Sequence, residues 1–123
     1  MTDDGLEQLT LRLTRPEYPD AYRTGRGSDA GVDVLSDLQV PPERAWQCKN
    51  GKPNWNDCRE SLKAAMKEFE PLHYTFVFPR PLTRQQLSWF RTKFLPQQRK
   101  LYPKLKTLIS GTISPTASLA GLS

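Results

Sequence analysis

The stretch DCRESLKAAMKEFEPLHYTFVF, residues 57–78, indicates the fold because it places an amphipathic helix directly before a strand. In its first part, Leu62, Ala65, Met66 and Phe69 recur at i, i+3, i+4 and i+7, which is the spacing of one buried helix face. The charged residues of the same part fall on the other faces. This part is therefore predicted to be a helix that packs against a sheet.

The ends of that helix and the strand after it are also marked. Asp57 and Glu60 have the spacing of a capping box, and Pro71 ends the helical pattern. In the run His73–Phe78, aromatic residues occupy every second position, which predicts a strand with one buried face.

A second helix is predicted to follow, because Thr83 and Gln86 form another capping-box pair. Its inward residues are Leu87, Phe90 and Phe94.

Proline is expected to divide the helical C-terminal part. Pro96 should interrupt the second helix, since a proline inside a helix removes a backbone hydrogen bond. Beyond it, Leu101, Leu105 and Leu108 are expected to continue a helical stripe around Pro103.

The N-terminal part has strand patterns separated by a long loop. Leucines alternate with polar residues from Leu9 to Leu13, which predicts a half-buried strand. Residues 15–31 have no period and are predicted to be a loop. A second strand is predicted over residues 32–40, where Pro41-Pro42 stops it.

The segment 46–55 contains the dipeptide Asn50-Gly51, which favours the tight turn of a β-hairpin. With this turn, Trp46 would face Trp55 across the two strands. A short helix from Pro42 through Trp46 is the alternative for the first half of this segment.

These elements predict an α+β fold, with a small mixed or antiparallel sheet and two to three helices packed on one face. A length of 123 residues suits one domain. We expect residues 1–109 to form it, with a basic helical part over 79–109. Residues 110–123 are rich in Ser, Thr, Gly and Ala and are predicted to be a flexible tail.

The net charge of +5 is distributed very unevenly along the chain. The first 70 residues contain all 13 acidic residues and 10 basic ones, whereas residues 71–123 contain eight basic residues and no acidic one. Aromatic residues lie among these cations. A region of one sign with interleaved aromatic rings is typical of a surface that binds a polyanion.

We therefore predict a small, non-enzymatic module that binds nucleic acid, with single strands or RNA slightly favoured by the aromatic residues. The cations would neutralise phosphates, and the aromatic rings of Trp89 and Tyr102 would stack on bases. The predicted contact residues are Arg84, Trp89, Arg91, Lys93, Arg99, Lys100, Tyr102, Lys104 and Lys106.

The alternative is a protein-interaction module, such as an inhibitor, adaptor or assembly component. Its basic face would dock on an acidic surface of a protein partner. Charge asymmetry alone does not separate the two, because both partners are acidic.

Other classes of function have less support in the sequence. No apolar run approaches the length of a membrane span and no secretory signal is present, so we expect a cytoplasmic protein without membrane contact. Cys48, Cys58 and the single His73 cannot form a closed zinc site, and nothing in the sequence joins them into a catalytic pair. Asp33 and Asp37 could lie on one strand face, but the alternation favours a solvated face. We predict no cofactor, no metal and no catalytic residue.

One short stretch resembles a known family. Residues 26–34, followed by Val40-Pro41-Pro42, are similar to the first motif of trimeric dUTP pyrophosphatases. The resemblance implies that Asp33 helps to hold the magnesium that bridges a triphosphate. It covers about a fifth of the chain, and the family's other motifs have no counterpart here. The helical second half also conflicts with the all-β jelly-roll of that family, so the chain is not assigned to it.

Overall fold

The computed structural model describes residues 2–25, 30–114 and 118–120, and these form an α+β fold with an open mixed sheet, as predicted. Strands β1 to β6 lie in the sheet in chain order. The elements are α1 (Asp3–Thr14), β1 (Tyr22–Arg23), β2 (Val34–Leu35), β3 (Arg44–Cys48), α2 (Trp55–Glu68), β4 (His73–Phe78), α3 (Arg84–Trp89), the π-helical turn η1 (Phe90–Phe94), α4 (Leu95–Leu101), β5 (Thr107–Ser114) and β6 (Ser118–Ala120).

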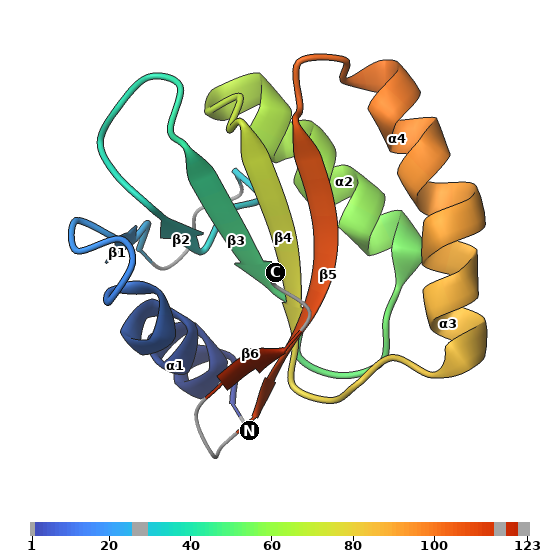
Figure 1. The fold of residues 1–123 in the computed structure, drawn as a ribbon, viewed down its shortest axis with the longest axis horizontal. Coiled ribbons are helices and arrows are strands. Elements are labelled where there is room, and N and C mark those ends of the chain that lie inside the picture. Colours follow the sequence, from blue (N-terminus) through green and yellow to red (C-terminus); the bar gives the residue numbers. More distant parts are fainter. Residues whose placement is uncertain (1, 26–29, 115–117, 121–123) are drawn as a thin grey trace.

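The central strands β3, β4 and β5 are parallel, whereas β1, β2 and β6 are antiparallel to their neighbours. Parallel neighbours need crossover connections, and α2 and the helix formed by α3, η1 and α4 supply them. Both crossover helices lie along the same face of the sheet, and α1 lies at the other face (Figure 1). The carboxyl ends of β3 and β4 therefore open onto the same edge.

Two apolar clusters fill the two faces of the sheet. Alternation along β4 divides them, since Tyr74, Phe76 and Phe78 face the crossover helices and Val77 faces α1. Most of the predicted inward residues of the two helices join the first cluster; they are Leu62, Ala65, Met66, Phe90 and Phe94, with Phe69 partly buried against it. Leu87, also predicted to face inward, is only half-buried. The helix and strand predicted within residues 57–78 are thus confirmed. The predicted capping box of Asp57 and Glu60 is wrong, because α2 begins at Trp55 with Asn54 as its N-cap.

The predicted strand at residues 9–13 is wrong, because this segment belongs to α1. The side-chain oxygen of Thr2 caps the helix by accepting a hydrogen bond from the Gly5 N–H at 3.0 Å. Thr10 and Thr14 are buried with Leu6, at helical spacing. The threonine hydroxyls donate to helix carbonyls, so they can be buried without unpaired polar groups.

The predicted hairpin over residues 46–55 and its short-helix alternative are both wrong. β3 instead pairs in parallel with β4. The register places Arg44 opposite His73, which lies 29 residues later in the sequence. Gly51 has a φ of +106°, so the Asn50-Gly51 pair does form a turn, but this turn leads into α2. A local turn signal cannot show which distant strand its flanking residues will pair with.

Pro96 does not interrupt the helix from Arg84 to Leu101. A π-helical turn precedes it, in which the Leu95 N–H donates to the Phe90 carbonyl. This wider turn accommodates the proline ring, which would otherwise meet the carbonyl of the preceding turn. The capping box of Thr83 and Gln86 is confirmed.

The predicted helical stripe through Leu101, Leu105 and Leu108 is also wrong. The helix ends at Leu101, whose side chain is 61% exposed, and Leu108 lies in β5. The prediction of a tail beyond residue 110 is wrong for 110–114 and 118–120, which are strands; the other residues of that segment lie outside the described ranges. Pairing with β4 orders β5, and no local pattern reports such pairing.

The loop predicted over residues 15–31 contains the short strand β1, and residues 26–29 lie outside the described ranges. The strand predicted over 32–40 is limited to β2, after which Leu38 and Val40 are 81% and 95% exposed. The open α+β sheet also differs from the jelly-roll that the resemblance to dUTP pyrophosphatases implied. Within the described ranges, no helix has the length and apolar character that crossing a membrane requires.

Replacing Tyr74 by Phe is expected to lower the free energy of unfolding by about 1–3 kcal/mol. The buried Tyr74 hydroxyl donates to the Gly31 carbonyl at 2.7 Å, and its removal leaves that buried carbonyl unpaired. Urea unfolding followed by circular dichroism measures the loss. Tyr22→Phe is the matched control, because no hydrogen bond of its hydroxyl to a described residue is recorded; an equal loss in both variants would contradict the prediction.

Candidate functional site

A polar cavity of about 300 Å³ lies at the edge where β3 ends. In sheets with parallel strands, ligands commonly bind outside the carboxyl ends of the strands. Side chains from α1, β3, α2 and the segments between them meet here, although they are far apart in the sequence. The lining residues are Asp3, Glu7, Asp33, Gln47, Cys48, Lys49, Asn50, Lys52, Asn54 and Asp57.

Asp33 is the innermost carboxylate of this cavity and is held by the β3 backbone. It directly precedes β2, and its Oδ2 accepts a hydrogen bond from the Cys48 N–H at 2.8 Å. The pKa of Asp33 is raised from 3.8 to about 6. Burial is the main cause and the nearby Glu7 carboxylate adds to it, while the hydrogen bond from the Cys48 N–H and the charges of Lys49 and Arg23 oppose the rise. A cation bound nearby would stabilise the ionised form of this half-buried carboxylate.

Glu7 reaches the cavity from α1. Arg23 on β1 donates to Glu7 at 3.2 Å and to Asp4 at 2.8 Å. The hydrogen bond to Asp4 is the main cause of a raised pKa of Arg23. Arg23 thus ties α1 to β1 and holds Glu7 beside Asp33.

Lys49, one residue beyond β3, supplies a cation at the same edge. Its Nζ donates to Asp57 Oδ2 at 2.6 Å and to Ser61 Oγ at 2.7 Å, both on α2. Its side chain is only 14% exposed. Lys49 is therefore oriented by α2 and is not a freely mobile surface charge.

Gln47 provides an unpaired acceptor. Its side-chain oxygen is buried and has no hydrogen-bond partner among the described residues. A buried polar atom without a partner is uncommon, because leaving it unpaired costs free energy.

The cavity contains four carboxylates, from Asp3, Glu7, Asp33 and Asp57, against two lysines. No group of three or more His, Cys, Asp or Glu side chains in the described part of the chain is placed to hold a metal ion together. A divalent cation here would take one or two carboxylates and complete its coordination with water and substrate oxygens, which is common for Mg²⁺. Asp33 and Glu7 are the residues that could hold it.

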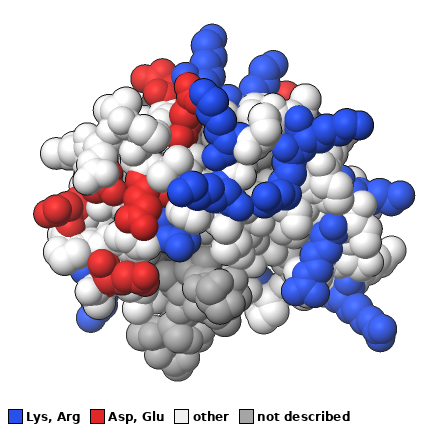
Figure 2. Space-filling view, turned by 45° about the horizontal axis from the view of Figure 1, so that its top comes forward, with Lys and Arg blue, Asp and Glu red and all other residues white. Residues whose placement is uncertain are grey.

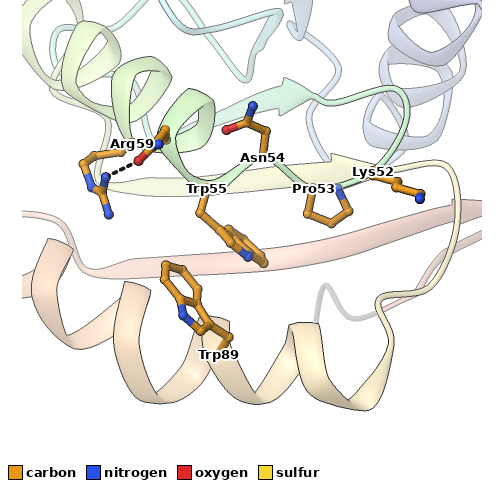
Figure 3. A pocket seen from close by; sticks show the side chains of 7 residues that line it. Lys52, Pro53, Asn54, Trp55, Arg59 and Trp89 are labelled. Carbon is orange, nitrogen blue, oxygen red and sulfur yellow. Dashed lines mark hydrogen bonds between the residues drawn. The ribbon is translucent and has the colours of Figure 1, made fainter.

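Lys52 lies at the junction of this cavity with two others. One, of about 620 Å³, is lined by the loop 52–54, by Trp55, Asn56 and Arg59 of α2, and by Trp89. The indole rings of Trp55 and Trp89 lie almost parallel, with centroids 5.2 Å apart (Figure 3). Trp89 also lines a further cavity of about 530 Å³ with Arg84 and Lys93. A series of depressions that share lining residues thus extends from the carboxylates across α2 to α3.

The structure brings only some of the predicted contact residues near this series. Arg84, Trp89 and Lys93 line it, whereas Arg91 is exposed on η1 without lining a described cavity. Arg99 and Lys100 on α4, and Tyr102, Lys104 and Lys106 beyond it, lie toward the opposite edge of the sheet. Figure 2 shows basic side chains spread over the helical side of the molecule and most visible acidic ones gathered on the left.

The two predicted stacking residues are not free rings. One face of Trp89 is covered by Trp55, and Tyr102 packs against the core, where burial raises its pKa. All seven predicted cations are exposed, and no salt bridge joins any of them to a described carboxylate. They are available to an external anion.

The thiols and the histidine do not form a site. Burial raises the pKa of Cys48 and of Cys58 to about 12, so both thiols are protonated near neutral pH. His73 begins β4, at the opposite end of the sheet from Cys48, and its Nδ1 lies 2.8 Å from Thr107 Oγ1. No cysteine–histidine pair is brought together.

The sequence missed Glu7, Gln47 and Lys49. It favoured a solvated strand face for Asp33, and only the short resemblance to dUTP pyrophosphatases implied a magnesium ligand at that position. Glu7 was placed before a supposed strand, and the supposed hairpin put Lys49 at a turn. One sequence signal could have brought part of this site together. Asp33 directly precedes one strand, and the polar residues Gln47 and Lys49 lie at the end of the next strand, so antiparallel pairing of the two strands places all three at the same end. Comparisons with protein families, with curated proteins and with solved structures find no match for this chain.

Proposed function

We propose that this protein binds nucleic acid and hydrolyses a phosphodiester bond in it, with a divalent cation held by Asp33 and Glu7. The observation that carries the proposal is the convergence of Asp33, Glu7 and Lys49 on one cavity, beside the unpaired oxygen of Gln47. This proposal replaces the sequence-based expectation of a non-enzymatic module.

The charge of the cavity is the first argument for a cation. Arg23 pairs with Glu7 and Lys49 with Asp57, but no salt bridge to a described residue is recorded for Asp3 or Asp33, so a phosphate would be repelled unless a cation lay beside them. A bound divalent ion supplies two effects in hydrolysis: it stabilises negative charge on the phosphate and lowers the pKa of a bound water. Its oxygen ligands would be Asp33 and Glu7, and Glu7 is positioned by its hydrogen bond from Arg23.

Lys49 has the chemistry to contact the phosphate. An ammonium group next to the reacting phosphate stabilises the charge that builds up on its oxygens. The hydrogen bonds to Asp57 and Ser61 orient Lys49 before substrate arrives. An oriented donor loses less entropy on binding than a mobile surface lysine.

The surroundings suit a polyanionic substrate. Lys52 adjoins the carboxylates, and Arg84 and Lys93 lie further along the same series of depressions. These cations and the exposed ones on α4 would contact phosphates without reading sequence. The excess charge of +5 favours such a partner over a neutral metabolite. The cytoplasm remains the proposed location, in keeping with two free thiols.

Docking on an acidic protein is the second candidate, and one observation favours it. Arg99, Lys100, Lys104 and Lys106 are exposed at a distance from the carboxylate cavity. This group could contact a protein partner while the cavity acts on nucleic acid.

The test is incubation of the protein with labelled single-stranded DNA, duplex DNA and RNA, with Mg²⁺, Mn²⁺ or EDTA. Cleavage is expected with a divalent ion and not with EDTA. Glu7→Gln is expected to reduce the rate at least about 100-fold, since it removes a cation ligand. Glu17→Gln, an exposed glutamate away from the cavity, is the matched control.

Binding is measured separately, by fluorescence anisotropy across a salt series. Log affinity should fall linearly with log salt. Binding without cleavage under every cation would overturn the hydrolytic half of the proposal. No binding at low salt would overturn the nucleic-acid half and favour the acidic protein partner.

A further inference from the structure

We infer that a second cavity beside the carboxylates binds one unpaired nucleotide of the substrate, so that the protein acts on single-stranded segments. This inference rests on the proposed function. The cavity has a volume of about 570 Å³ and lies between the loop after β3 and the segment that joins β4 to α3. Pockets for small ligands commonly have volumes of this order, about 300–1,000 Å³.

The walls of this cavity suit a nucleobase. Pro79, Pro81 and Leu82 contribute apolar surface, whereas Phe78, which also borders the cavity, is only 1% exposed. The apolar faces of a base gain from burial against such a surface, whatever the identity of the base. Gln86 adds a specific donor: its side-chain oxygen accepts from the Thr83 N–H, so its amide N–H groups remain for a ligand.

The charges of the cavity suit the phosphate of the same nucleotide. Lys52 and Arg80 are its two cations, both exposed, and no acidic side chain is among its lining residues. No hydrogen bond or salt bridge of either cation to a described residue is recorded. An apolar wall with two free cations at its rim matches a base joined to a phosphate.

The position next to the carboxylate cavity identifies the occupant as part of the substrate. Both cavities are lined by Lys52 and by Asn50, so they adjoin. A nucleotide seated in the second cavity would place its backbone at Lys52, beside Asp33 and Glu7. A base in a duplex is stacked and paired, so it could enter only after it left the helix, at a cost in free energy.

The experiment measures binding in EDTA, where no cleavage occurs. Fluorescence anisotropy compares a labelled single-stranded dodecanucleotide, the same sequence as a duplex, and a deoxyribose-phosphate dodecamer without bases. The wild-type protein is expected to bind the single strand at least about 5-fold more tightly than the other two, the lower end of the effect of stacking one base.

Leu82→Arg fills the cavity and adds a positive charge, so general attraction to phosphates is kept. It is expected to abolish the preference for the single strand. Leu101→Arg makes the same change on an exposed residue of α4 and should keep the preference. Equal affinity of the wild type for all three probes, or a preserved preference in Leu82→Arg, would overturn the inference.

Arg80→Ala keeps the test valid if Leu82→Arg does not fold. Arg80 is exposed, and its removal should weaken single-strand binding and reduce the salt slope by about 1. Unchanged affinity and slope would overturn the inference. If the protein cleaves nucleic acid but shows no preference for the single strand with bases, the proposed function stands and the nucleotide site is overturned. If it shows the preference but no cleavage, the nucleotide site stands and the hydrolytic function is overturned.

Discussion

Asp33→Asn is expected to make the protein more stable at pH 7.5 and to reduce the proposed phosphodiester cleavage at least about 100-fold. The two effects have one cause, the burial of a carboxylate that would be a cation ligand. An asparagine oxygen can still accept the hydrogen bond from the Cys48 N–H, but it carries no charge. A gain in stability with a loss of activity is typical of a residue kept for function.

The stability effect has a definite pH dependence. The pKa of Asp33 is raised from 3.8 to about 6, so the folded protein holds this proton more tightly than the unfolded chain does. Stability therefore falls as pH rises from about 4 to about 6, and the loss is complete above that range. Each pKa unit corresponds to about 1.4 kcal/mol. Because Asp33 is partly exposed and solvent screens its charge, we expect about 1–2 kcal/mol.

Thermal unfolding at pH 4 and pH 7.5 measures this effect. Asp33→Asn should match the wild type near pH 4 and exceed it by about 1–2 kcal/mol at pH 7.5. Asp20→Asn, an exposed residue away from the cavity, should change stability by less than about 0.5 kcal/mol at both values. A variant less stable than the wild type at pH 7.5 would contradict the assignment of Asp33 as a buried, destabilising carboxylate.

The melting temperature in added Mg²⁺ tests whether Asp33 binds a cation, separately from the effect of its buried charge on stability. An ion that binds only the folded state raises the melting temperature. We expect such a rise for the wild type at pH 7.5, a smaller one at pH 5, where Asp33 is protonated, and none for Asp33→Asn. Equal rises in both proteins would place the cation elsewhere.

Gly31→Ala is expected to lower the free energy of unfolding by about 3–5 kcal/mol, a large part of the 5–15 kcal/mol of an ordinary domain. Gly31 has a φ of +72°, and an added Cβ would lie 1.9 Å from the Ser61 carbonyl oxygen of α2. Backbone atoms on both sides of this contact would have to move. The carbonyl of Gly31 also accepts a hydrogen bond from the Tyr74 hydroxyl, so this hydrogen bond would be disturbed as well.

Gly51→Ala is the matched control, since Gly51 also has a positive φ, +106°, but no atom within 4 Å of an added Cβ. It should cost only the left-handed conformation of one residue, about 1–2 kcal/mol. Urea unfolding of the two variants separates backbone strain from steric contact. A cost for Gly31→Ala no greater than that for Gly51→Ala would contradict the close approach between this segment and α2.

Local signals identified those parts of the fold whose structure depends on neighbours in the sequence. The apolar face of α2, the alternation of β4 and the capping box at Thr83 were all predicted correctly. Each depends on residues within one or two turns, or along one strand. α1 was missed, because the alternation of Leu9, Leu11 and Leu13 predicted a strand where the structure has a helix.

The site was less predictable, because its residues meet only through the sheet. Asp33 and Cys48 are 15 residues apart, and their hydrogen bond depends on the pairing of β2 with β3. Glu7 joins them because α1 lies across the face of the sheet opposite α2. Predicting a hairpin at Asn50-Gly51 excluded this arrangement, since it turned β3 away from β4.

The amino-acid order alone established the α+β class, the main crossover helix, the central strand and the excess of positive charge in the second half, since each follows from local periodicity or composition. Strand partners, the order of residues 107–114 and the gathering of Asp33, Glu7 and Lys49 were decided by tertiary pairing. The physical reason is that backbone hydrogen bonds between strands are the same for every sequence. Their partners are selected by burial of side chains that are distant along the chain.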